Sequence, residues 1–149
     1  MKVFLASDHA GFELKEEVKK DLLDQNYDVQ DCGAFSFDKD DDYPDLIAKA
    51  AENVSENPAS KGIVFGKSGA GEAITANKIK NIRAFVGFSE DNVRLAREHN
   101  DANVLSLGSE FVNITRAKNL ARIFLETLFS NEERHARRIE EIQEIEDRQ

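Results

Sequence analysis

Short apolar runs alternate with amphipathic stretches along this chain. The runs have the length and the Val, Ile, Leu and Phe content of buried strands, whereas the stretches repeat their apolar residues at helical spacing. Strands are expected over residues 2–6, 27–29, 62–65, 83–88 and 103–107. Helices are expected over 11–25, from Pro44, over 72–80, over 89–98 behind a Ser89 cap, and behind a Thr115 cap. This order predicts an α/β protein with a five-stranded, mostly parallel sheet and helices on both faces.

The 149 residues fit one domain, 1–149, and no segment rich in Pro, Gly or Ser divides them. An extra helix is expected at the C-terminus, over residues 131–147. Its only sustained apolar row is Ile139, Ile142 and Ile145, which is too thin to cover a core. We therefore expect this helix to pack on a second subunit, and the alternative is a frayed terminal helix.

The charge and composition exclude several classes of function. A net charge of −9 disfavours non-specific binding to nucleic acid, which depends on Lys and Arg at the phosphates. It allows a small anionic substrate, because a few local cations or backbone N–H groups are enough to hold one phosphate. Much of the acidity lies in the loop 38–42 and the segment 140–147, both of which are expected to be solvated surface.

The sequence also predicts a cytoplasmic location. No apolar stretch approaches the ~20 residues that span a bilayer, so no membrane partner is expected. The apolar run at the N-terminus is too short for a signal peptide. Cys32 is the only cysteine, so it has no disulfide partner within the chain and no second thiol for a metal site.

Ligands of parallel α/β sheets bind outside the carboxyl ends of the strands, and the unusual residues of this chain are expected there. Asp8 and His9 follow the first strand, and a Gly-rich turn follows the third. His99, Asn100 and Asp101 lie next to the fifth strand. We expect these three groups to lie at the same edge of the sheet.

The turn Gly66-Lys67-Ser68-Gly69-Ala70-Gly71 joins a strand to the start of a helix. Its glycines and the unpaired N–H groups of the first helical turn could hold a phosphate or an oxyanion; the alternative is a tight connection without a ligand. It matches neither the nucleotide P-loop nor Gly-x-Gly-x-x-Gly. Glu72 follows directly, either as a charge that stabilises the helix N-terminus or as a general base beside oxyanion donors.

Histidines and arginines supply the other candidates. His9, His99 and His135 have no carboxylates at ligand spacing, so no metal site is expected. His99 lies in a dense polar segment before an apolar strand, which favours a function for it. Arg134 and Arg138 are four residues apart and share a helix face that suits capture of a phosphate. The alternative for them is a solvated patch paired with nearby glutamates.

Five motifs carry a resemblance that extends in order over nearly the whole chain. They are Ser7-Asp8-His9-Ala10-Gly11-Phe12, Asp42-Tyr43-Pro44-Asp45, Gly69-Ala70-Gly71 with Ala76-Asn77-Lys78, the segment Arg97 to Asn103, and Arg134-His135-x-x-Arg138. Together they resemble the ribose-5-phosphate isomerase B family, which also includes galactose-6-phosphate and allose-6-phosphate isomerases. The resemblance implies a Rossmann-like three-layer sandwich. It also implies a homodimer, or a homotetramer, whose sites are each built from two subunits.

The same resemblance implies an aldose–ketose isomerase of small sugar phosphates that works through a cis-enediol without metal or cofactor. One branch of the family has a Cys base at the position of Gly66. Another has a Glu base at the position of Glu72, in a Gly-x-Ser-Gly-x-Gly-Glu pattern that this sequence contains. The resemblance therefore assigns the base to Glu72. It makes His99 the residue that helps to open the sugar ring, with Asp8 as its helper.

The resemblance also implies the substrate contacts. The residues expected to bind substrate are Asp8, His9, Tyr43, Lys67, Ser68, Gly69, Ala70, Gly71, Asn100, Arg134 and Arg138. Among these, His9 and the two arginines hold the phosphate. One departure is Glu110, which stands where many relatives have a phosphate-binding Arg.

Three alternatives remain open at this point. The first is an isomerase of a six-carbon sugar phosphate. The second is a non-catalytic subunit, for which Glu110 leaves some room. The third is a flavodoxin-like signalling module, which is disfavoured because a glycine turn stands where a phosphoacceptor Asp would be needed.

Overall fold

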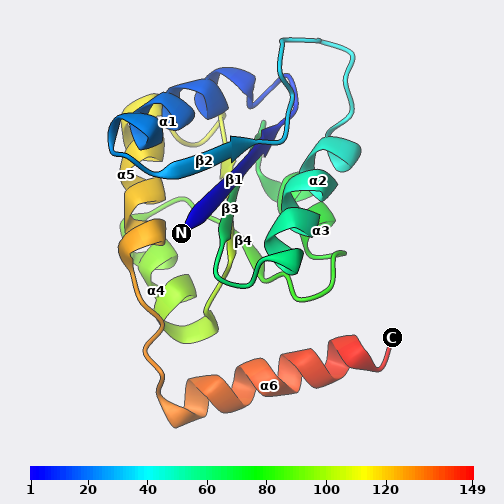
Figure 1. The fold of residues 1–149 in the computed structure, drawn as a ribbon, viewed down its shortest axis with the longest axis vertical. Coiled ribbons are helices and arrows are strands. Elements are labelled where there is room, and N and C mark those ends of the chain that lie inside the picture. The colour runs from blue at the N-terminus through cyan, green and yellow to red at the C-terminus, as the bar shows by residue number, and fades with distance from the viewer.

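In a computed structural model that describes residues 1–149, five strands form one sheet in the order β2-β1-β3-β5-β4 (Figure 1). All four strand pairings are parallel. The strands are β1 (Lys2–Ser7), β2 (Asp28–Asp31), β3 (Lys61–Gly66), β4 (Ala84–Val86) and β5 (Val104–Gly108). The expected α/β class and the parallel sheet are therefore confirmed.

Helices cover both faces of the sheet, as the sequence predicts (Figure 1). One face packs against α1 (Phe12–Asp24), α4 (Glu90–Asn100) and α5 (Ile114–Glu126), and the other against α2 (Tyr43–Glu56) and α3 (Ala70–Ala76). The alternation of side chains along β1 shows why two cores form: Val3 and Leu5 enter the first, whereas Phe4 and Ala6 enter the second.

The last helix, α6 (Glu133–Asp147), lies outside these layers and passes beneath the sheet (Figure 1). It packs on α4, where His135 in its first turn stacks on His99. Near its C-terminal end, Glu146 accepts a hydrogen bond from the Asn81 backbone N–H at 2.9 Å, and Asp147 pairs with Lys80 at 2.9 Å. Ile142 and Ile145 remain 46% and 49% exposed. The helix is thus docked on its own chain at both ends, while two of the three residues of its apolar row stay about half exposed.

Some predicted boundaries are wrong. The helix expected over 72–80 begins at Ala70 and ends at Ala76, because Gly69 turns the chain at φ 81° and the Asn77 side chain ties the exit to β4 through Ala84. The cap of α5 is Asn113, whose side chain accepts from the Arg116 N–H, and not Thr115. The Ser89 cap of α4 is confirmed as a capping box with Asn92. None of the helices combines the length and apolar character that a membrane span requires.

Candidate active site

The candidate residues form two groups at opposite edges of the sheet. Asp8, His9 and the Gly-rich turn follow β1 and β3, so they lie at the edge where the strands end, which we call the carboxyl edge. His99 and Asn100 are the last residues of α4 and precede β5, so they lie at the opposite, amino edge. There, the Asn103 carbonyl accepts a hydrogen bond from Gly62 N–H, near the start of β3. The prediction that His99, Asn100 and Asp101 share an edge with the turn is therefore wrong for a single chain, because α4 runs antiparallel to the strands.

At the carboxyl edge, the Gly-rich turn is held in one conformation by its neighbours. Gly69 adopts φ 81°, in the left-handed region, and its buried carbonyl accepts a 2.7 Å hydrogen bond from Ser106 Oγ of β5. Ser68 Oγ accepts from the Ala70 N–H at 3.1 Å. The segment after β5 straps the turn from the other side, through Ser109 N–H to the Gly66 carbonyl at 2.9 Å. These hydrogen bonds brace the turn, and its Lys67 and Ser68 side chains are exposed.

The Glu72 carboxylate occupies the space beside Gly66. Glu72 is 3% exposed, and a Cβ atom at Gly66 would overlap its carboxylate atoms. Burial raises the pKa of Glu72, and the nearby Asp8 charge raises it further, while the backbone N–H groups of Glu72 and Gly69 partly offset the rise. A buried carboxylate with a raised pKa, next to backbone donors, is suited to act as a general base.

Two more predicted residues lie at the same edge, near the turn and Glu72. The Tyr43 ring lies directly on the turn, because a Cβ atom at Gly71 would come within 2.6 Å of Tyr43 Cζ. Asp8 is 6% exposed, and its Oδ1 accepts a hydrogen bond from the Gly11 N–H at 3.1 Å. The structure therefore brings Asp8, Tyr43, Glu72 and the turn together, as predicted.

His9 is paired with a carboxylate that sequence reasoning missed. Asp41 Oδ1 lies 2.7 Å from His9 Nδ1 and accepts from the His9 backbone N–H at 3.0 Å. This hydrogen bond is the main reason that the pKa of His9 is raised. Ligand atoms of Asp8, His9 and Asp41 lie within 4.8 Å of one another. His9 Nδ1 is bonded to Asp41, and Asp8 Oδ1 is bonded to the Gly11 N–H. We therefore interpret these three residues as a His9–Asp41 ion pair with the Asp8 carboxylate nearby.

At the amino edge, α6 brings predicted residues to His99. The rings of His99 and His135 stack with centroids 4.1 Å apart and planes 11° from parallel. His135 is 5% exposed, and its Nε2 is buried without a hydrogen-bond partner. Arg134 and Arg138, on the same helix, are exposed. Arg134 Nε donates to Glu132 at 3.1 Å. One of the arginines is therefore paired with a nearby glutamate, as in the alternative of a solvated charged patch.

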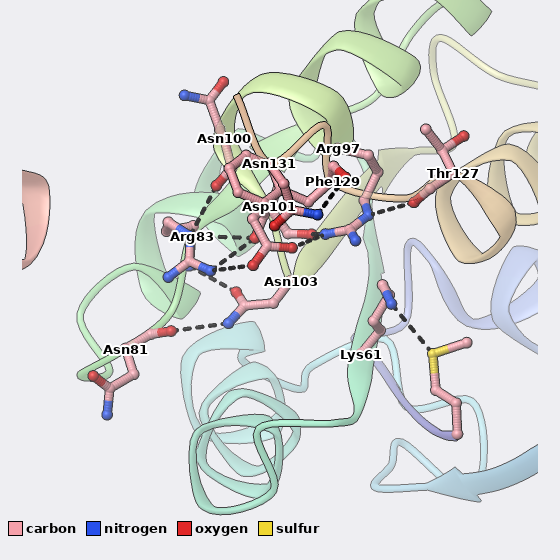
Figure 2. Close-up of polar contacts among 12 residues, drawn as sticks. Lys61, Asn81, Arg83, Arg97, Asn100, Asp101, Asn103, Thr127, Phe129 and Asn131 are labelled. Carbon is pink, nitrogen blue, oxygen red and sulfur yellow. Dashed lines mark hydrogen bonds and ion pairs between the residues drawn. The ribbon is translucent and has the colours of Figure 1, made fainter. Parts of the chain in front are cut away.

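A buried arginine anchors the segment that leads from α5 into α6 (Figure 2). Arg97, 5% exposed, donates from Nε to the Thr127 carbonyl at 3.1 Å and from Nη1 to Asp101 at 2.8 Å. Arg83 approaches Asp101 from the opposite side (Figure 2). Ser130 N–H also donates to the Glu98 carbonyl at 3.1 Å. These contacts fix the segment between α5 and α6 to the end of α4, and so place His135 against His99.

Known proteins resemble this chain over nearly its whole length. A family model described as Ribose/Galactose Isomerase matches residues 3–142. The chain belongs to this family. It is 41% identical to ribose-5-phosphate isomerase B of Mycobacterium leprae strain TN, over 98% of this chain and 90% of the relative. It is 38% identical to the probable ribose-5-phosphate isomerase B of Mycoplasma genitalium, over 94% of this chain and 92% of the relative.

Solved structures of the family have the same fold. The crystal structure of ribose-5-phosphate isomerase B from Mycoplasma genitalium with bound ribulose-5-phosphate has a TM-score of 0.95 at 37% identity, covering 99% of this chain and 97% of that one. The enzyme from Clostridium thermocellum also has a TM-score of 0.95, at 39% identity and 99% coverage of both chains. The Rossmann-like architecture that the resemblance implies is thus confirmed.

Glu110 stands where the resemblance implies that many relatives have an Arg. Its backbone N–H donates to the Lys67 carbonyl at 3.0 Å, so it lies beside the Gly-rich turn. Its side chain is exposed and forms no ion pair within the chain. The carboxylate is therefore free to turn toward solvent or toward an arginine.

Proposed function

We propose that this chain is an aldose–ketose isomerase that interconverts ribose 5-phosphate and ribulose 5-phosphate in the cytoplasm, through a cis-enediolate. The observation that carries the proposal is the Glu72 carboxylate, buried against Gly66 beside the Gly-rich turn, with a raised pKa. Membership of the Ribose/Galactose Isomerase family and the relatives named ribose-5-phosphate isomerase B support the substrate.

In the proposed reaction, Glu72 removes the proton from C2 of the open aldose and returns it to C1, while the hydroxyl proton of O2 passes to O1 in the cis-enediolate, so that the carbonyl moves from C1 to C2. The negative charge that develops on the substrate oxygen is held by backbone N–H groups of the Gly-rich turn other than those of Gly69 and Ala70, which already bond Glu72 and Ser68 Oγ. A carboxylate of ordinary pKa is a weak base for such a proton. Burial raises the pKa of Glu72 and so brings it closer to the pKa of the substrate C2–H. The oxyanion donors stabilise the enediolate and so lower the pKa of that C–H group.

We infer that a complete site forms between two subunits of a homodimer, each site taking the carboxyl edge of one chain and the amino edge of the other. His99 and Glu72 lie at opposite edges of one chain, so a single chain does not bring them to one substrate. Large exposed aromatic side chains follow three strands at the carboxyl edge, and such side chains are enriched at protein interfaces: Phe35 (76% exposed), Phe37 (63%), Phe88 (58%) and Phe111 (68%).

This arrangement gives roles to the remaining residues. His99 of one subunit and Asp8 of the other move the protons that open the furanose ring, and Asn100 holds a substrate oxygen. His9 at the carboxyl edge, with Arg134 and Arg138 from the other subunit, holds the phosphate. The exposure of both arginines fits a ligand or partner that covers them only in the assembly.

The second candidate is the same reaction on a six-carbon sugar phosphate. The family description names galactose as well as ribose, and Glu110 replaces a cation expected near the phosphate. Pocket size in the dimer separates the two substrates.

The experiment is to measure ketose formation by the purified protein from ribose 5-phosphate, allose 6-phosphate and galactose 6-phosphate, each with and without a chelator. The proposal predicts preferred turnover of ribose 5-phosphate that survives the chelator. Preference for a six-carbon substrate would support the second candidate. The absence of turnover with all three would contradict both and favour a non-catalytic subunit.

A further inference from the structure

The loop between β2 and α2 supplies a carboxylate that contacts His9 in two ways. Asp41 Oδ1 accepts from the His9 backbone N–H at 3.0 Å and lies 2.7 Å from His9 Nδ1. The two residues are 32 positions apart, so the contact depends on the folded loop. The sequence predicts solvated surface for this loop, but the Asp41 side chain is only 14% exposed.

Hydrogen bonds within the loop hold Asp41 in place. Asp38 forms a turn in which its carbonyl accepts from the Asp41 N–H at 3.1 Å and its carboxylate accepts from the Asp40 N–H at 3.0 Å. Phe37 packs edge-on against the His9 ring, with centroids 6.2 Å apart. The His9 ring is therefore held between an aromatic contact with Phe37 and a hydrogen bond to the Asp41 carboxylate.

The chemistry of the pair fixes the protons of the imidazole. A carboxylate oxygen at 2.7 Å from Nδ1 requires a proton on Nδ1. The neutral ring would then have a bare Nε2, which can only accept a hydrogen bond. Only the charged ring, protonated at both nitrogens, can donate from Nε2 to a phosphate oxygen.

The surroundings favour that charged ring. Three carboxylates face His9: Asp41, Asp8 at the end of β1, and Asp38 in the loop. Together they raise its pKa, with the Asp41 hydrogen bond as the largest cause and partial burial as the opposing one. Asp41 Oδ2 is buried without a hydrogen-bond partner, and His9 is the only cation paired with this carboxylate. An unpaired buried carboxylate is unfavourable, so Asp41 in turn gains from a charged His9.

We propose that Asp41 is a positioning residue that holds His9 as an imidazolium, with its Nε2–H directed away from Asp41 and toward the phosphate of the substrate. The inference rests on the proposed function, because it takes His9 to be a phosphate ligand. It adds Asp41, from the loop between β2 and α2, to the site, and it assigns a protonation state to His9.

The first test is a titration of the histidine rings by NMR. The chain has only three histidines, so His9→Asn identifies the His9 signal. In the wild-type protein, His9 should titrate above the ordinary value of 6.5. Asp41→Asn should lower the midpoint of the His9 titration. Asp40→Asn is the control, because Asp40 is an exposed carboxylate in the same loop, and it should leave the His9 midpoint close to wild type. A wild-type midpoint at or below 6.5, or an unchanged midpoint in a folded Asp41→Asn protein, would overturn the proposal.

The second test is the Michaelis constant for ribose 5-phosphate at about pH 6 and about pH 8. Asp41→Asn should raise KM several-fold at the higher pH, where its His9 has lost the proton, and much less at the lower pH. The kcat value should stay near wild type at both. An equal rise at both pH values, or no rise at either, would overturn the role of Asp41 in phosphate binding. The NMR result does not depend on turnover, so failure of the pair and failure of the proposed function are distinguishable.

Discussion

The rings of His99 and His135 stack face to face, with centroids 4.1 Å apart, although they belong to α4 and α6. Burial against α4 and the nearby His99 lower the pKa of His135 from its ordinary value of 6.5. His135 is therefore neutral in the folded protein at a pH where the unfolded chain already binds a proton. By linkage, its contribution to stability is present above about pH 6.5 and is lost as the pH falls toward the lowered pKa.

His135→Phe should consequently flatten the pH dependence of stability on the acid side. Phenylalanine keeps an aromatic ring in the stack but takes up no proton. The measurement is the thermal midpoint of both proteins at about pH 7.5 and about pH 5.5. The wild-type midpoint should fall more than that of the variant over this interval, and parallel curves would contradict a buried, neutral His135.

Gly66→Ala should damage catalysis through steric displacement. The added Cβ would overlap the Glu72 carboxylate, which must move away from its place beside the turn. Displacement of a catalytic group by an ångström can lower the rate by about 100-fold, and we expect a loss of kcat of that order with little change in KM. Gly62→Ala, in the same strand but against Val54 and Val104, is the matched control and should retain kcat. A kcat near wild type in Gly66→Ala would show that the carboxylate position is not critical.

Glu72→Gln should abolish turnover while binding of ribulose 5-phosphate persists. The amide keeps the shape of the side chain but cannot accept the C2 proton. Steady-state kinetics and calorimetric titration measure the two properties separately. Glu52→Gln is the control, because Glu52 is an exposed carboxylate on α2, and it should behave as wild type in turnover and in binding. Substantial residual turnover in Glu72→Gln would require another base.

Arg138→Ala should raise KM for ribose 5-phosphate, by about tenfold or more, and leave kcat nearly unchanged. A guanidinium–phosphate hydrogen bond that is present in both ground and transition states contributes to binding uniformly. Arg137→Ala is the control, because the adjacent exposed arginine projects from another side of the helix. An unchanged KM in Arg138→Ala would remove this residue from the phosphate site.

Much of the fold follows from the sequence because each strand and helix has its own periodicity. The boundaries of the helices and strands do not follow from the sequence in this way, because contacts between distant segments decide them. Asn77 ends α3 by bonding to Ala84 of β4, which a helical pattern of apolar residues does not reveal. Lys15 is fully buried in α1, with its ammonium group on Asp31 and the Ala34 carbonyl, although a lysine predicts a solvated position.

The site divides in a similar way. Residues next to one another in the chain, such as the turn and Glu72, are placed correctly from sequence. His99 is placed at the wrong edge, although the signal was available, because any residue that directly precedes a strand of a parallel sheet lies at the amino edge. Asp41 has no comparable signal. It lies in an acidic run, and its partner is 32 residues away.

In the proposed two-subunit site, Glu72 comes from one subunit and His99 from the other. The direct measurement is the activity of a mixed dimer, co-expressed with two different tags, in which one chain carries Glu72→Gln and the other His99→Asn. Each variant alone should be severely impaired. The mixed dimer contains one site with both substitutions and one site with neither, so it should recover about half of the wild-type rate. A mixed dimer that stays as inactive as its parents would rule out the two-subunit site, because it would place Glu72 and His99 of the same chain in the same site.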